Sequence, residues 1–268
     1  MQIAFTKYEG AGNDFILIDD RKELFHAEPQ LIAHLCDRYR GIGADGLMTL
    51  QRSARQQAAM RYFNADGSEG EMCGNGGRCF ALFAHRLGID TKVLHFEAAD
   101  GLHTARMCHV EGTVAQVELG IINVSTIESG DGWWFVNTGV PHYVEFVEEI
   151  DTVDVDGRGR QIRHDTARFA QGTNVNFVQL LGEGKISVRT YERGVEAETQ
   201  ACGTGATAAA IITNYARQHN TTKYEITVPG GELSVQFAHQ PNTQIYTDIR
   251  LTGAARSVYE GVFDTENF

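Results

Sequence analysis

Hydrophobic and polar residues alternate over much of the chain, which is typical of β-strands that bury one face. The alternating segments are short, and glycine-rich turns separate them. We expect strands within residues 2–20, 41–50, 58–64, 92–100, 102–110 and 113–120, and again within 133–147, 174–181, 185–192, 224–231, 232–239 and 244–253. Both halves of the chain are therefore predicted to be rich in strands.

Three segments show the spacing of helices instead. Residues 29–40 fit a short amphipathic helix, and two longer helical patterns follow residues 73 and 202. The apolar positions are Leu31, Ile32, Leu35 and Cys36, then Phe80, Phe83, Ala84 and Leu87, then Ala208, Ile211, Ile212 and Tyr215. Ala81 and Leu82 widen the apolar face of the second helix, which predicts burial on several sides.

The two longer helices are preceded by the same arrangement of residues. The sequences are EMCGNGGRC around Cys73 and TQACGTGAT around Cys202, so each cysteine stands directly before glycines that open a helix. A strand and a polar loop come first, with Asn64 nine residues before Cys73 and Arg193 nine residues before Cys202. We interpret this as a partial internal duplication. It predicts two α/β halves, each with strands around one central helix.

This arrangement suits acid–base chemistry at carbon. A helix N-terminus offers unpaired backbone N–H groups and a positive field, and glycines let a ligand approach them closely. The same field lowers the pKa of a thiol and favours a bound carboxylate. If the two helix N-termini face one cleft, Cys73 could remove an α-proton while Cys202 supplies one to the opposite face, with roles exchanged in the reverse direction.

Composition and charge narrow the classes of partner. The net charge of −12 argues against nucleic acid and anionic membrane surfaces, and no apolar run reaches the ~20 residues of a membrane helix. The N-terminal residues do not read as a secretory signal. Five cysteines, an odd number, fit the reducing cytoplasm better than a disulfide framework.

Seven motifs spread along the chain resemble the diaminopimelate epimerase family. They are GAGNDF (10–15), GIGADGL (41–47), FNADGSEGEMCGNGGRC (63–79), GVPH (139–142), GTNVNFV (172–178), YERGVEAETQACGTGATA (191–208) and LTGAARSVYEGVF (251–263). The paired cysteine motifs are the most specific of these.

The resemblance implies a fold and an activity. The fold is of the α/β (α+β) class, with two pseudo-symmetric domains that each wrap a mixed, largely antiparallel sheet around a central helix. The expected domains are residues 1–119 with 255–268, and residues 120–254, with the active site in the cleft between them. The implied activity is cofactor-independent interconversion of LL- and meso-diaminopimelate, in the synthesis of lysine and peptidoglycan precursors. A homodimer in the cytoplasm is implied as well.

The resemblance also assigns roles to individual residues. Cys73 and Cys202 match the catalytic pair, supported by His142 and Glu192. Backbone donors for the reacting carboxylate are implied at Gly74, Asn75, Gly203 and Thr204. Asn13 and Glu192 match partners of the ammonium group at the reacting centre, while Asn64, Asn174 and Arg193 match readers of the distal end. No metal or cofactor is implied.

Departures from the family pattern leave alternatives open. Some relatives carry Gln where this chain has Gly46, and many carry Asn where it has Val140; both side chains touch substrate there. The stretch GVEAET has one residue more than a common GVGET version. A histidine racemase or a proline or hydroxyproline epimerase of the same plan is therefore an alternative. A non-catalytic ligand-binding relative is another.

The remaining candidates have simpler interpretations. Cys36, Cys79 and Cys108 are expected to be small apolar residues. A zinc site at His103, Cys108 and His109 lacks a ligand-pair spacing, and strand alternation would send the last two to opposite faces. His142 could be structural as well as catalytic, and the three asparagines Asn13, Asn64 and Asn174 could be turn formers.

Overall fold

The computed structural model describes residues 1–89 and 91–265, and they form two compact units. One unit comprises Met1–Leu119 and Gly253–Phe268, and the other comprises Gly120–Thr252. The second boundary lies two residues before the expected position 255, inside a continuous strand. Within the described residues, every helix is too short or too polar to cross a membrane.

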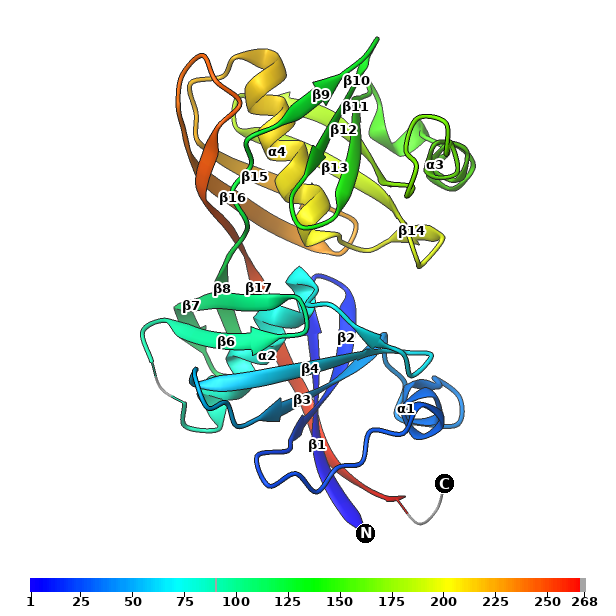
Figure 1. Cartoon of the computed structure of the whole chain (residues 1–268), viewed down its shortest axis with the longest axis vertical. Coiled ribbons are helices and arrows are strands. Elements are labelled where there is room, and N and C mark those ends of the chain that lie inside the picture. Colours follow the sequence, from blue (N-terminus) through cyan, green and yellow to red (C-terminus); the bar gives the residue numbers. More distant parts are fainter. Residues whose placement is uncertain (90, 266–268) are drawn as a thin grey trace. The chain divides into compact units, whose positions relative to one another are not determined.

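A closed sheet surrounds one helix in the first unit (Figure 1). Its strands are β1 (Gln2–Gly10), β2 (Asn13–Asp19), β3 (Gly46–Gln51), β4 (Ala58–Asn64), β5 (Glu69–Gly70), β6 (Leu94–Ala98), β7 (Gly101–Glu111), β8 (Val114–Gly120) and part of β17 (Tyr246–Asp264). Pairing runs from β1 through β2, β3, β4, β6, β7 and β8 to β17, which pairs back with β1. Only the β2–β3 and β4–β6 pairs are parallel among these.

The central helix of this unit is α2 (Gly74–Arg86). It contacts β1, β2, β3 and β7, and it is buried on all sides from Gly74 to Ala84. Phe80 and Leu82 are fully buried in one cluster with Phe96 and Leu17 from the strands. The short helix α1 (Pro29–Cys36) lies against β3 and closes a second cluster. The all-round apolar pattern of the sequence is thus explained by a helix inside a closed sheet.

The second unit repeats this plan around α4 (Gly203–Arg217). Its strands are β9 (Ile127–Ser129), β10 (Trp133–Asn137), β11 (Pro141–Phe146), β12 (Asn174–Gly182), β13 (Lys185–Glu192), β14 (Ala197–Thr199), β15 (Lys223–Val228) and β16 (Gly231–His239). Helix α4 contacts β10, β11, β12, β13, β15 and β16 (Figure 1). The β11–β12 and β13–β15 pairs are parallel, and the others are antiparallel.

One helix of the second unit was not expected from the sequence. Helix α3 (Val155–Arg163) carries few apolar residues and two glycines, so its pattern is weak. Asp154 caps it by accepting a hydrogen bond from the N–H of Gly157. Gly159 lets the helix lie directly on Tyr191 of β13, because a Cβ there would come within 2.6 Å of the Tyr191 ring. The docked partner therefore stabilises a helix that the local pattern does not indicate.

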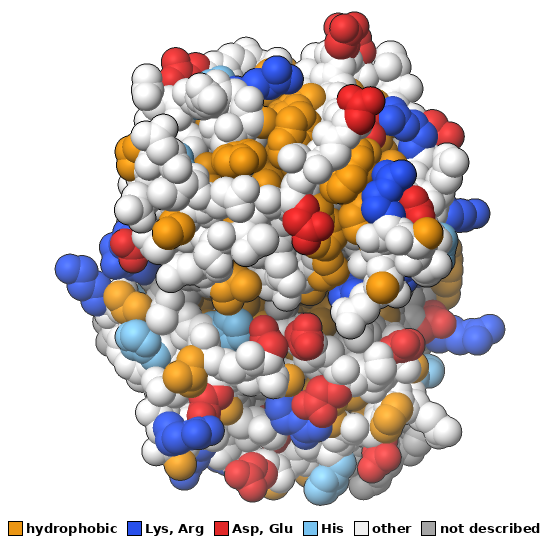
Figure 2. Space-filling model, turned by 45° about the horizontal axis from the view of Figure 1, so that its top comes forward, with side chains coloured by type: hydrophobic (Ala, Val, Ile, Leu, Met, Phe, Trp, Pro, Cys, Tyr) orange, Lys and Arg blue, Asp and Glu red, His pale blue; other side chains and the backbone are white. Residues whose placement is uncertain are grey.

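The face shown in Figure 2 carries acidic and basic side chains side by side. In the described residues, ion pairs link neighbouring strands, such as Arg61 with Glu69 at 2.9 Å and Lys185 with Glu225 at 3.0 Å. On this face the basic side chains are interspersed with acidic ones and form no continuous positive surface.

Candidate active site

Cys73 is the N-cap residue of α2. Its backbone is extended, with φ −97° and ψ 147°, and its Sγ accepts a hydrogen bond from the N–H of Gly76 at 3.1 Å. A side-chain acceptor at an N-cap satisfies one of the donors that the first turn leaves unpaired. The sulfur is therefore held at the positive end of the helix, where a thiolate is stabilised.

A chain of side-chain hydrogen bonds begins one turn into α2. Arg78 donates from Nη2 to Oδ1 of Asn75 at 2.9 Å, and Asn75 donates from Nδ2 to Oδ1 of Asn13. Asn13 in turn donates from Nδ2 to Oδ2 of Asp45 at 3.0 Å. Two predicted site residues, Asn13 and Asn75, are thus held together with Cys73 in the first unit.

Arg78 is the unusual member of this chain. It is fully buried, and its remaining donors bind the carbonyl oxygens of Gly74 at 3.2 Å and Ala254 at 3.3 Å. These three hydrogen-bond acceptors are neutral oxygens, so the guanidinium is held behind the helix N-terminus by uncharged groups. Burial lowers the pKa of Arg78, while the nearby Cys79 and Cys73 oppose that shift.

Asn64 lies at the end of β4, where the polar loop begins. Its Nδ2 donates to the hydroxyl of Ser68 at 3.1 Å, and its backbone N–H bonds to the Ser68 carbonyl at 2.8 Å. Gly46 is the cross-strand partner of Asn64. A Cβ at Gly46 would lie 2.6 Å from Cε2 of Tyr62, so the Tyr62 ring occupies the space that a larger residue at position 46 would need.

Cys202 repeats the arrangement of Cys73 in the second unit. It is the N-cap of α4, and its Sγ accepts a hydrogen bond from the N–H of Gly205 at 3.4 Å. The Thr204 hydroxyl lies 3.5 Å from the same sulfur, and Thr138 donates to the Thr204 carbonyl at 2.9 Å. Gly203 is the first residue of the helix, as Gly74 is in α2.

His142 is fully buried on β11, beside Asn174 of β12 in the strand register. Its Nδ1 lies 3.2 Å from Nδ2 of Asn176, which also donates to the Tyr143 carbonyl at 2.7 Å. Thr190 donates to Oδ1 of Asn176 at 3.0 Å. Burial lowers the pKa of His142 to about 3, and the charge of Arg193 acts in the same direction. The imidazole is therefore neutral near pH 7.

The remaining predicted residues lie at the end of β13. Oδ1 of Asn174 accepts a hydrogen bond from the backbone N–H of Arg193 at 2.7 Å, and Nη1 of Arg193 donates to the Gln171 carbonyl at 3.1 Å. Glu192 accepts a hydrogen bond from the Thr199 hydroxyl across the β13–β14 hairpin. The longer GVEAET loop is accommodated in this hairpin, with Glu196 in the left-handed region at φ 60°.

Comparison with known proteins identifies the family. A family model described as diaminopimelate epimerase matches residues 5–124 and 134–257. The diaminopimelate epimerase of Flavobacterium psychrophilum is 44% identical, over 95% of this chain and 97% of that protein. The one from Chlorobaculum tepidum is 42% identical, over 94% of this chain and 98% of that protein. The chain belongs to the diaminopimelate epimerase family.

Solved structures of other proteins share this fold. A phenazine biosynthesis protein of the PhzF family from Bacillus anthracis matches with a TM-score of 0.74 at 14% identity, over 98% of this chain and 99% of that one. A hydroxyproline epimerase from Agrobacterium vitis matches with a TM-score of 0.66 at 14% identity, over 97% and 92%. At these identities the likeness establishes the fold alone, and it confirms the expected α/β class.

The other cysteines of this diaminopimelate epimerase family member have different surroundings. Cys36 and Cys79 are buried, and burial raises the pKa of Cys36 to about 12 and that of Cys79 well above its usual value. Cys108 is exposed, and its pKa is raised by partial desolvation and by Glu118. A raised thiol pKa disfavours the thiolate, so these three are poor candidates for proton transfer.

The strand alternation used above to separate Cys108 from His109 is interrupted. The register of β7 shifts between Met107 and His109, so a bulge lies at Cys108. Cys108 donates weakly to the Arg106 carbonyl at 3.9 Å, and His103 pairs with Asp100 at 3.0 Å. In the described part of the chain, no three His, Cys, Asp or Glu side chains are grouped as a metal site requires.

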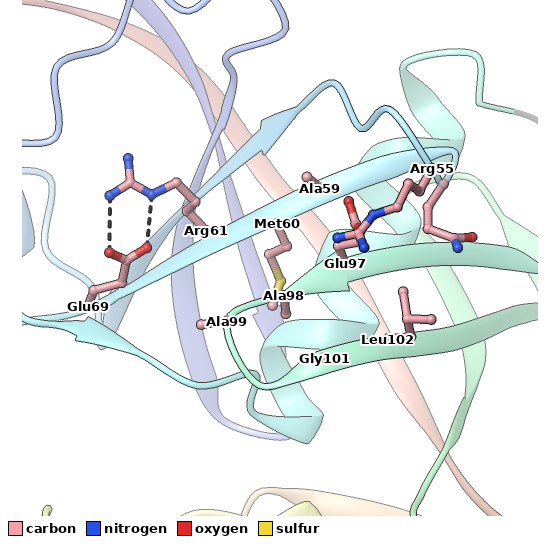
Figure 3. Close-up of a pocket in the computed structure, with 11 residues that line it drawn as sticks. Arg55, Ala59, Met60, Arg61, Glu69, Glu97, Ala98, Ala99, Gly101 and Leu102 are labelled. Atoms are coloured by element: carbon pink, nitrogen blue, oxygen red, sulfur yellow. Dashed lines mark hydrogen bonds and ion pairs between the residues drawn. The ribbon is translucent and has the colours of Figure 1, made fainter.

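A cavity of about 540 Å³ lies in the first unit, and its lining includes the Arg61–Glu69 pair but neither cysteine of the proposed site (Figure 3). It opens between β4, β5 and β6 over the buried Met60. Its two arginines are both paired, Arg55 with Glu97 at 2.7 Å and Arg61 with Glu69 at 2.9 Å. The charges of both arginines are thus balanced within the wall of the cavity.

Four residues of the two sites were missed by sequence reasoning: Asp45, Arg78, Asn176 and Thr190. A weak signal was present for two of them. Arg78 is a charged residue directly before the apolar run of a buried helix, and Asn176 interrupts the apolar run of a buried strand. Asp45 and Thr190 give no such signal, because polar residues are common in turns and strands.

Proposed function

We propose that this chain is a diaminopimelate epimerase, an isomerase that interconverts LL- and meso-diaminopimelate by moving a proton at the α-carbon. Membership of the family over nearly the full length supports this substrate. The observation that carries the mechanism is the pair of N-cap cysteines, each accepting a backbone N–H of its own helix.

In the proposed mechanism the two cysteines act from opposite faces of the substrate. The thiolate of one takes the α-proton, and the C–H electron pair is delocalised into the carboxylate. The thiol of the other then gives its proton to the opposite face, which inverts the carbon and leaves the cysteines with exchanged protonation states. Neither oxidation nor a cofactor is required by this balance.

Backbone donors at the two helix N-termini would stabilise the charge that develops on the carboxylate. Gly74, Asn75, Gly203 and Thr204 occupy these first turns. Asn13 and Glu192 would hold the α-ammonium group. Asn64, Asn174 and Arg193 would bind the distal amino-acid end, where a guanidinium suits a carboxylate because it can donate two parallel hydrogen bonds. His142 and Glu192 would support the cysteines.

The test of substrate is deuterium uptake at the α-carbon in D2O, without added cofactor and under reducing conditions. We expect uptake with LL- and meso-diaminopimelate and none with proline or histidine. Uptake with proline or histidine alone would overturn the substrate assignment in favour of a related racemase. No uptake with any amino acid, from a folded protein, would favour a ligand-binding relative.

The test of mechanism is substitution of each cysteine alone. We expect Cys73→Ala and Cys202→Ala each to abolish epimerisation, because each face of the carbon needs its own acid or base. Cys108→Ala is the control, since Cys108 is exposed on β7. Retained turnover in either of the first two variants would rule out the two-base mechanism.

We further propose that the protein is a cytoplasmic homodimer. In the described part of the chain, none of the five cysteines forms a disulfide, which suits a reducing compartment. Val258 and Val262 on β17 are 51% and 61% exposed, and they leave an apolar face on this strand. Sedimentation equilibrium tests the dimer: Val262→Asp should shift the protein towards monomer if this face is buried in it, and a monomeric wild type would overturn it.

A further inference from the structure

The orientation of the Asn176 side chain is determined by one backbone carbonyl. Nδ2 lies 2.7 Å from the Tyr143 oxygen, which can only accept a hydrogen bond. The amide nitrogen must therefore face this carbonyl, and Oδ1 must face the Thr190 hydroxyl, 3.0 Å away. All of these atoms are buried within the second unit. In the alternative orientation Oδ1 of Asn176 would face the Tyr143 carbonyl oxygen. Both atoms are acceptors, so this orientation is excluded.

This orientation determines where the proton of His142 lies. The second hydrogen of the Asn176 amide points to Nδ1 of His142 at 3.2 Å. Nδ1 must then be the unprotonated acceptor, because two N–H groups cannot share a hydrogen bond. A neutral imidazole with a bare Nδ1 carries its proton on Nε2.

Nε2 of His142 is buried and has no hydrogen-bond partner in the part of the chain that the structure describes. Buried N–H groups in folded proteins almost always have an acceptor, and an unpaired one is costly. An acceptor from outside the protein, or a group that moves when a ligand binds, would complete the site.

The charged groups around His142 favour an anion as that acceptor. Arg193 at the end of β13 is the cation that faces it. Cys202 stands at the start of α4, near the same point: a Cβ at Gly205 would lie 3.2 Å from Cys202 Sγ and would clash with Oδ1 of Asn176. The neighbours of His142 on β10 and β12 are Val136 and Asn174, which do not titrate.

We propose that Asn176 is a positioning residue that holds His142 as the neutral tautomer with its proton on Nε2, so that His142 donates a hydrogen bond to an anionic group, a thiolate or a carboxylate, and does not act as a base. The role in turnover rests on the proposed function, whereas the tautomer does not. A buried strand thus supplies the amide that selects one of the two states of the imidazole.

The first test is spectroscopic. Protein labelled with nitrogen-15 in its ten histidine rings is measured from pH 5 to pH 9, and His142 is assigned by the signal lost in His142→Gln. We expect one bare and one protonated nitrogen at every pH, with the proton on Nε2. A proton on Nδ1, or a doubly protonated ring at pH 6, would overturn the proposal whatever the substrate is.

The second test uses a matched pair of variants. Asn176→Asp keeps the shape but replaces the donor to Nδ1 by an acceptor. Asn214→Asp makes the same change at a second buried asparagine, whose Nδ2 binds the carbonyls of His219 and Thr221 and whose Oδ1 accepts from Tyr246. Asn214 lies at the other end of α4. Its substitution therefore measures the loss of stability caused by a buried carboxylate that does not contact His142.

We expect Asn176→Asp to move the proton of His142 to Nδ1 and to lower kcat at least tenfold, with a smaller change in KM. Asn214→Asp should lower the melting temperature but leave the tautomer and kcat within twofold of the wild type. Equal losses of kcat in both variants, or an unchanged tautomer in Asn176→Asp, would show that Asn176 is only structural. If Asn176→Asp does not fold, the wild-type spectrum still decides the tautomer.

Discussion

The sulfur of Cys73 accepts a hydrogen bond from the N–H of Gly76 at 3.1 Å, three residues into the helix that Cys73 caps. The same relation, at 3.4 Å, joins Cys202 to Gly205. In both places a larger residue would meet close neighbours. A Cβ at Gly76 would lie 3.0 Å from the Cys73 sulfur, and one at Gly205 would lie 3.2 Å from the Cys202 sulfur.

Gly76→Ala is expected to displace the Cys73 thiol and to lower kcat at least tenfold, because the new methyl group meets both the sulfur and the end of Met48. Gly77→Ala is the matched control. Its methyl group would meet the flexible ends of Met72 and Leu119 instead, at 2.9 and 3.2 Å. The test compares kcat of the two variants under conditions where their thermal stabilities are equal. Equal kcat values would mean that the Gly76 contact does not position the thiol.

Arg78→Met is expected to destabilise the first unit by about 3 kcal/mol or more, because two buried acceptors and one partly buried acceptor lose a charged donor. The acceptors are Oδ1 of Asn75 and the carbonyls of Gly74 and Ala254. Arg55→Met, at a side chain 81% exposed, should cost less than about 1 kcal/mol. Urea denaturation measures both, and a similar small cost for the two would contradict the role assigned to Arg78.

Asp14 is expected to make the protein sensitive to acid. Lys7 at 2.8 Å and Arg38 at 2.8 Å both pair with it. Although burial raises the pKa of Asp14, these hydrogen bonds lower it to about 2. A lowered pKa contributes stability that is fully present above the unfolded value of ~3.9 and is lost as the pH falls towards 2.

Asp14→Asn should therefore lower the free energy of unfolding by about 2 kcal/mol at pH 7, and by less at pH 3. The exposed pair of Asp19 with Arg21 offers the control, since Asp19→Asn should cost under about 1 kcal/mol at both values. Denaturation curves at the two pH values give the comparison. If Asp14→Asn lowers the free energy of unfolding by the same amount at pH 3 and pH 7, the effect comes from packing and not from the ion pairs.

Gly46→Gln is expected to destabilise the protein by about 2 kcal/mol or more, because the added side chain overlaps the Tyr62 ring and the Phe63 carbonyl. The double variant Gly46→Gln with Tyr62→Ala removes the ring. Its loss of stability should therefore be smaller than the sum of the losses in the two single variants. The double-mutant cycle is read from thermal melting. Additive effects would mean that the ring does not occupy the space at position 46.

Local sequence was sufficient for the two central helices and their cysteine caps. Helical periodicity, N-capping and the need for glycine beside a thiol all act between residues a few positions apart, so they can be read from Cys73 to Leu87 and from Cys202 to Tyr215. The strands followed from alternation in the same way. Helix α3 did not, because Gly157, Gly159 and its charged residues mask the face that packs on Tyr191.

The polar networks behind the cysteines were decided only by tertiary structure. His142 and Asn176 are 34 positions apart, Asn13 and Asn75 are 62 apart, and Arg78 and Ala254 are 176 apart. Their contacts exist because closed or nearly closed sheets bring distant strands around one buried helix, where a polar atom must find a partner. The sequence by itself determined which residues begin the two central helices. The folded sheet determined which polar side chains lie behind the cysteines at those helix ends.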